Sequence, residues 1–124
     1  MDLEERFKEI KVENIILIIY YVLISFCLYA NNVEKNYFLT GNNNSKELYR
    51  KLNISIFTVA VIIYLYFTYD GYKALKNLNI NDSLKKKDLT NLSFIGSFLI
   101  LISGFIFLYI AYTDEEIETE IAFT

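Results

Sequence analysis

The feature that most constrains this chain is the separation of its charged residues from its apolar ones. Three blocks contain no Asp, Glu, Lys or Arg, namely residues 15–30, 54–69 and 92–112. Every charged residue lies between or beyond these blocks. A chain of 124 residues is too short to bury three uncharged helices in a water-soluble core and still cover them with polar surface. The pattern therefore predicts that lipid surrounds these blocks.

The lengths of the blocks agree with helices that cross a bilayer. At about 1.5 Å per residue, the third block covers about 31 Å and each shorter block about 24 Å, against a hydrocarbon core about 30 Å thick. Flanking residues complete the shorter spans, because lysine side chains at span ends can reach the interface. The alternative, a soluble amphipathic bundle, would place charge on one face of each helix, and no face of any block carries charge.

The sequence thus predicts an all-α integral membrane protein with three long transmembrane helices and short connections. We expect one domain over residues 1–124, with spans at about 12–31, 53–72 and 91–112 and an acidic tail at 113–124. The chain contains no proline, so each helix can continue beyond its span.

Turn-forming residues predict where the helices begin. The cluster at 41–45 indicates the first connection, with Ser45 as the expected N-cap of the second helix. Asp82 or Ser83 is the expected N-cap of the third helix. Before the first span, apolar residues recur at helical spacing among charged neighbours. That segment is expected to be helical, and either to lie in the interface or to prolong the first span.

Composition excludes several chemistries. Without His there is no imidazole base, and with one Cys there is neither an internal disulfide nor a cysteine zinc site. The net charge of −3 offers no basic surface for nucleic acid. No ionisable Asp, Glu, Lys or Arg lies within a charge-free block to hold a transported ion or proton. We therefore expect no catalytic residue, no cofactor, no metal site and no enzyme.

The distribution of Lys and Arg predicts an orientation. Eight of these residues lie in segments 1–14 and 73–91, and four lie in segment 31–53. The positive-inside rule then places the N-terminus and the 73–91 loop in the cytoplasm and the C-terminus outside. On the cytoplasmic side, Lys85, Lys86 and Lys87 are expected to contact anionic lipid headgroups.

The third span carries a stripe of small residues. They fall within an arc of about 120° at about 3.6 residues per turn. Small side chains let helix backbones approach closely where lipid removes the hydrophobic drive for association. The stripe predicts either packing against another span of the same chain or a homo-oligomer interface. Its members are Ser93, Gly96, Ser97, Ser103, Gly104 and Ala111.

These observations lead to a functional hypothesis and two alternatives. The leading hypothesis is a small non-enzymatic membrane protein that acts through helix–helix association, as a homo-oligomer or as an accessory or regulatory subunit. Its expected partners are membrane lipids and either itself or another membrane protein, with no nucleic acid. One alternative is a pore-forming protein, holin-like or a small channel, whose hydroxyls at Ser55, Thr58, Tyr66 and Tyr69 would line the pore. The second alternative is a membrane immunity protein, which only the size of the chain supports.

Overall fold

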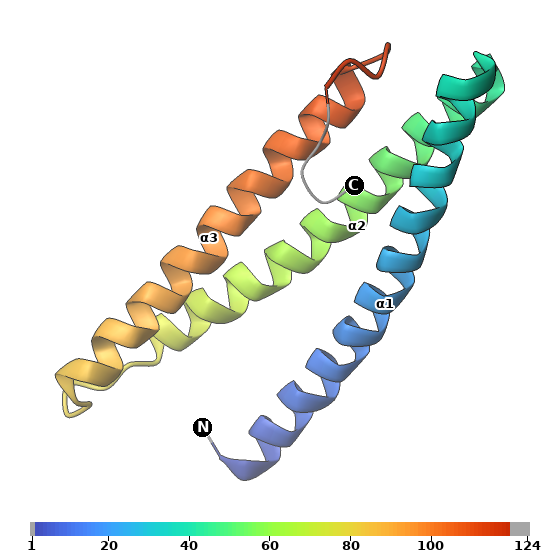
Figure 1. Ribbon diagram of the computed structural model, residues 1–124. Helices are drawn as coiled ribbons and strands as arrows, with labels where there is room; N and C mark the ends of the chain where they lie inside the picture. The colour runs from blue at the N-terminus through green and yellow to red at the C-terminus, as the bar shows by residue number, and fades with distance from the viewer. Residues whose placement is uncertain (1, 120–124) are drawn as a thin grey trace. The chain divides into compact units, whose positions relative to one another are not determined.

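The computed structural model describes residues 2–119 and consists of three α-helices (Figure 1). They are α1 (Leu3–Thr40), α2 (Asn43–Lys76) and α3 (Leu84–Thr113). Of the described residues, 86% are helical and none forms a strand. The prediction of an all-α fold with three long helices and short connections is confirmed.

All three helices are long and apolar enough to cross a membrane. Their 38, 34 and 30 residues correspond to about 57, 51 and 45 Å, which exceeds the thickness of the hydrocarbon core. Each predicted span lies within one helix. Of the most apolar 18 residues in each helix, only 11% in α1, 33% in α2 and 17% in α3 are buried within the chain. Most of the apolar surface therefore remains for lipid or for partner helices.

The N-terminal segment prolongs the first span. Asp2 is the N-cap of α1, and its Oδ1 accepts the N–H of Glu5 at 2.7 Å. The helix then runs without a break to Thr40. It ends at Gly41, whose φ of 68° suits glycine and whose N–H donates to the carbonyl of Tyr37 at 2.7 Å. Of the two arrangements expected for this segment, continuation of the span is the one observed.

The second helix begins earlier than the turn residues predicted. Asn42 occupies the capping position, and its Oδ1 accepts the N–H of Asn44 at 2.9 Å. Ser45 already lies inside α2, and its Oγ accepts a hydrogen bond from Nδ2 of Asn36 at 2.7 Å. The prediction that Ser45 caps this helix is wrong, because an asparagine three residues earlier supplies an equally good acceptor.

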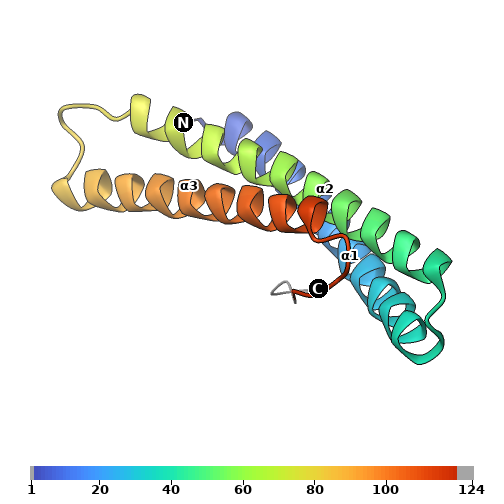
Figure 2. The same cartoon turned by 90° about the horizontal axis from the view of Figure 1, so that it is seen from above.

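Contacts within the chain divide it into two compact units, one up to Ile56 and the other from Phe57 onward. The first unit contains α1 and the beginning of α2, and the second contains the remainder of α2 and α3. Within the second unit, α2 and α3 lie antiparallel (Figure 2). The expected single domain stays a prediction. Helix α2 contributes most of the buried residues, namely Tyr49, Asn53 and Ile56 in the first unit and Phe57, Ala60, Val61 and Ile63 in the second.

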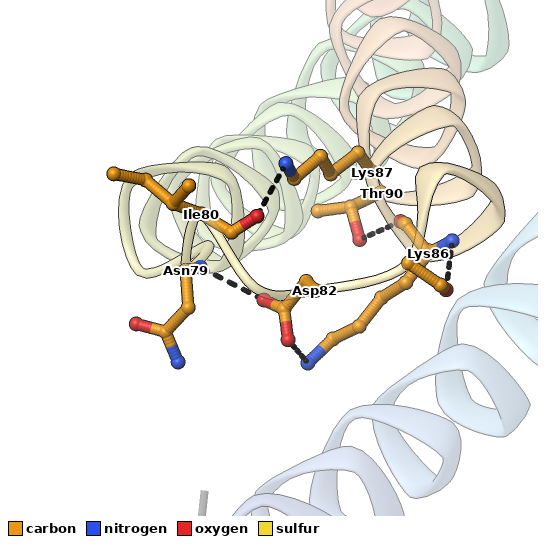
Figure 3. Close-up of polar contacts among 7 residues, drawn as sticks. Asn79, Ile80, Asp82, Lys86, Lys87 and Thr90 are labelled. Atoms are coloured by element: carbon orange, nitrogen blue, oxygen red, sulfur yellow. Dashed lines mark hydrogen bonds and ion pairs between the residues drawn. The ribbon is translucent and has the colours of Figure 1, made fainter.

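The connection between α2 and α3 is organised by one carboxylate (Figure 3). Asp82 Oδ2 accepts the N–H of Asn79 at 2.8 Å, and its Oδ1 accepts a hydrogen bond from Nζ of Lys86 at 3.2 Å. Ser83 is the N-cap of α3, and its Oγ accepts the N–H of Lys86 at 3.1 Å. Of the two predicted caps, Ser83 is therefore confirmed, and Asp82 holds the preceding turn instead.

These bonds lower the pKa of Asp82. The main cause is the hydrogen bond from the Asn79 N–H. The hydrogen bond and charge of Lys86 and the charge of Lys87 lower the pKa further, whereas partial desolvation raises it. Because the folded-state pKa lies below the unfolded value, the ionised carboxylate stabilises the turn at neutral pH. This stabilisation is lost as the pH falls through the folded-state pKa.

We expect the carboxyl group of Asp82 to titrate with a pKa below the ordinary aspartate value of about 3.9. The substitution Lys86→Ala should raise the midpoint, since it removes a hydrogen bond and a nearby charge. A ¹³C NMR titration in micelles measures both midpoints. Lys85→Ala is the matched control, because it removes a neighbouring charge that makes no hydrogen bond to Asp82. A midpoint for the unmodified chain at or above the ordinary value would contradict this account.

Candidate helix-packing site

The small residues of α3 separate into two sets in the structure. Gly104 and Ala111 are buried and Ser97 is half-buried, and these three follow one another at intervals of seven. The other three, Ser93, Gly96 and Ser103, are exposed. The predicted stripe is therefore only partly used in packing within the chain.

Gly104 marks a close approach between α3 and α2. A Cβ atom added at Gly104 would lie 2.9 Å from Cδ2 of Tyr64 and 3.2 Å from Cγ2 of Val61. The first of these distances is shorter than real Cβ contacts, so any side chain at position 104 would displace the tyrosine ring. Glycine is needed here because the ring occupies the space of a side chain.

A second glycine has the reciprocal role at the other end of this interface. A Cβ added at Gly71 of α2 would lie 3.3 Å from the Cα of Phe94 of α3. The ring of Phe94 also lies against that of Tyr72, with 6.2 Å between the ring centroids. Each helix thus places a glycine where the other helix places an aromatic residue, so the two surfaces are complementary at both points.

Between the two glycines, a hydroxyl joins the helices. Thr68 Oγ1 lies 2.8 Å from the carbonyl oxygen of Tyr64 in its own helix and 3.2 Å from that of Ser97 in α3. The hydroxyl hydrogen can therefore be shared between an intrahelical and an interhelical acceptor. Ser97 contributes its backbone carbonyl, which its small side chain leaves accessible to α2.

These contacts define one antiparallel register. Phe57 of α2 lies against Phe107 of α3, with ring centroids 5.9 Å apart. Further along α2, Tyr64 contacts Gly104, and Gly71 contacts Phe94. Advancing along α2 thus means moving back along α3 by a similar number of residues. The helices stay in contact over about four turns.

Sequence reasoning missed two residues of this interface. Thr68 and Gly71 lie three residues apart on α2, and both contact α3. Their spacing is a signal for a packing face, since residues three apart share one side of a helix. The hydroxyls singled out instead on α2 lie elsewhere: Ser55, Thr58 and Tyr69 are exposed, and Tyr66 is half-buried.

The predicted headgroup contacts lie at the start of α3. Lys85 and Lys86 are exposed, whereas Lys87 is half-buried and donates from Nζ to the carbonyl of Ile80 at 3.0 Å (Figure 3). Two of the three ammonium groups therefore also hold the turn. Contact with lipid stays a prediction for all three.

The acidic tail begins with a turn around one carboxylate. Asp114 accepts the N–H groups of Glu118 at 3.0 Å and of Thr119 at 2.7 Å. These bonds, with the Glu118 N–H as the main cause, lower the pKa of Asp114. Residues 120–124 of the predicted tail lie outside the described part of the chain. Among residues 2–119, no three Cys, Asp or Glu side chains gather as a metal site.

No protein-family model, curated protein or solved structure matches this chain. Its function has to be inferred from the geometry of the helices and from the residues that they leave exposed.

Gly104→Leu should lower the free energy of unfolding by about 1–3 kcal/mol, because the new side chain overlaps Tyr64. Titration with a denaturing detergent, at one chain per micelle, measures the change. The matched control is Gly96→Leu on the same helix, where an added Cβ meets nothing within 4 Å. Equal destabilisation by both substitutions would contradict a specific α2–α3 contact at Gly104.

Thr68→Val keeps the shape of the side chain and removes the shared hydrogen bond. The expected loss of stability is about 0.6 kcal/mol, the average for polar contacts between membrane helices, with an upper limit of about 1.7 kcal/mol. The same detergent titration measures it. Thr90→Val is the control, because Thr90 Oγ1 donates to the carbonyl of Lys86 in its own helix at 2.7 Å. A loss at Thr68 no larger than that at Thr90 would mean that the interhelical bond contributes nothing.

Proposed function

We propose that this chain is a multi-pass membrane protein that acts through helix–helix association, as a homo-oligomer or as an accessory or regulatory subunit of another membrane protein. The observation that carries the proposal is the exposed part of the α3 stripe. Gly96 and Ser103 lie seven residues apart on a side of α3 that the chain's own packing leaves open. In lipid, such a surface gains van der Waals contact only when another helix approaches it.

The chemistry of the spans supports binding rather than catalysis. The chain has no His, and the charge-free blocks contain no Lys, Asp or Glu to activate a nucleophile. The small side chains on α3 offer close backbone contact and hydroxyl hydrogen bonds. The proposal therefore includes lipids and membrane helices as partners, and excludes nucleic acid.

The proposed orientation has the N-terminus and the 73–91 loop in the cytoplasm and the C-terminus outside. It is supported by the excess of Lys and Arg in segments 1–14 and 73–91. Lys85 and Lys86 are exposed beside the start of α3, where anionic headgroups would attract each by about 1 kcal/mol.

A pore is the second candidate, and one observation favours it. Ser55 and Thr58 expose hydroxyl-bearing side chains on α2 within or beside its apolar span. Several copies arranged with these residues inward would enclose a polar surface. Entry of a membrane-impermeant dye into cells that express the chain would favour this candidate over a purely associating role.

Cross-linking tests self-association through α3. In a Cys27→Ser background, Ser103→Cys should form covalent dimers in native membranes several-fold more efficiently than Phe105→Cys. Both positions are exposed at nearly the same depth, and only Ser103 lies on the stripe. Adding Gly96→Leu should reduce the yield at Ser103, because the larger side chain keeps the helices apart. Equal yields at the two positions would contradict self-association through this stripe.

A further inference from the structure

Helix α1 carries an exposed stripe that the α3 interface does not explain. Starting at Leu3, its members recur at alternating intervals of four and three residues over four heptads. This spacing is that of the two contact positions of a coiled coil. All eight members are exposed: Leu3, Phe7, Ile10, Asn14, Leu17, Tyr21, Ile24 and Leu28.

The stripe lies on the opposite side of α1 from its buried residues. Ile16, Ala30 and Val33 are buried, and at 100° per residue they fall on the other half of the helix surface. The buried residues and the heptad residues therefore occupy different faces of α1. The eight positions form a continuous surface because α1 has no break between Leu3 and Thr40.

Part of this surface lies outside the hydrocarbon core. Residues 2–13 hold eight charged side chains, so this segment belongs in water or at the headgroups. Leu3 and Phe7 are nevertheless 70% and 60% exposed. The segment continues the spanning helix with neither glycine nor proline to bend it (Figure 1). We therefore expect it to follow the direction of the span. Lipid tails cannot cover these residues there.

We infer that α1 pairs with α1 of a second copy of this chain as a parallel coiled coil that continues from the membrane into the aqueous N-terminal segment. Copies inserted in one direction have the same residue at the same depth, so a parallel pair needs no shift in register. The inference rests on the proposed self-association and names the partner and a second contact, separate from that on α3.

Asn14 indicates that the occupant is a second copy. It is the one polar member of the stripe and lies where the charged segment meets the apolar span. In a parallel pair Asn14 would meet Asn14, and a carboxamide is its own hydrogen-bonding complement because it carries both a donor and an acceptor. One asparagine at such a position favours an in-register pair over other arrangements, because any shift leaves the amide against an apolar side chain.

One pair of like charges beside the stripe opposes this pairing, and ion pairs within α1 weaken the repulsion. In a parallel pair, Arg6 of one copy would approach Lys11 of the other. However, Arg6 NH1 lies 3.3 Å from a carboxylate oxygen of Glu9 and 3.6 Å from one of Glu13 in its own helix. These ion pairs reduce the positive charge that Lys11 would meet.

Cross-linking of the full chain in its membrane tests the inference. In a Cys27→Ser background, Ile10→Cys lies on the stripe and Val12→Cys lies on the opposite side of α1. The two native side chains are both aliphatic and both 37% exposed, so the control is closely matched. We expect oxidation to give covalent dimers several-fold more efficiently at position 10 than at position 12. Adding Asn14→Asp should lower the yield at position 10, since two carboxylates would then face each other.

The outcomes separate this inference from the α3 proposal. Dimers at position 10 but none at Ser103→Cys would support the α1 pair and reject the α3 stripe. Dimers at Ser103→Cys with equal or no reaction at positions 10 and 12 would overturn the α1 pair. The stripe on α1 would then be covered by lipid headgroups or by a different protein. A yield at position 10 that Asn14→Asp leaves unchanged would overturn the role of the asparagine.

Discussion

The arrangement of this protein depends on the absence of water in the bilayer core. Without water, each backbone N–H and carbonyl in a span must find its partner within the chain, and a continuous helix satisfies nearly all of them. Lipid also removes the hydrophobic drive that holds helices together in water. Close packing has to replace it. The Tyr64 ring lies against the backbone at Gly104, and the Cα of Phe94 lies against the backbone at Gly71. Thr68, between them, adds a hydrogen bond across the interface.

The same constraint explains why the helices can bury different shares of their apolar residues. Helix α2 buries the largest share of its apolar residues, and α1 and α3 leave most of theirs uncovered. In a soluble protein such surfaces would cause aggregation, but in a membrane they are compatible with lipid and available to partners. The two open surfaces differ in character. The open surface of α3 is formed by small side chains suited to close backbone contact. That of α1 is formed by bulky, heptad-spaced side chains and extends into the charged N-terminal segment.

Much of the fold followed from local rules. The charge-free blocks placed three helices, and Ser83 was one of the two residues expected to cap α3, because a serine hydroxyl can accept an N–H in the first turn of a helix. The N-cap of α2 was wrongly predicted to be Ser45, because several neighbouring residues offer equivalent acceptors. Only the path of the backbone selects Asn42 among them. The packing stripe was found in α3, but Thr68 and Gly71 were not found in α2. Their importance comes from Ser97 and Phe94 on the facing helix, which local patterns do not contain.

The sequence by itself determined the number of helices, their approximate bounds and their apolar character, because these follow from hydropathy, from the absence of proline and from the chemistry of the turns. Only the tertiary structure decided how the small residues of α3 are used. Gly96 and Gly104 are identical in sequence terms, yet one faces open space and the other faces Tyr64. The difference arises because the relative rotation of two helices is set by the fit of both surfaces, which is a property of the pair and not of either segment.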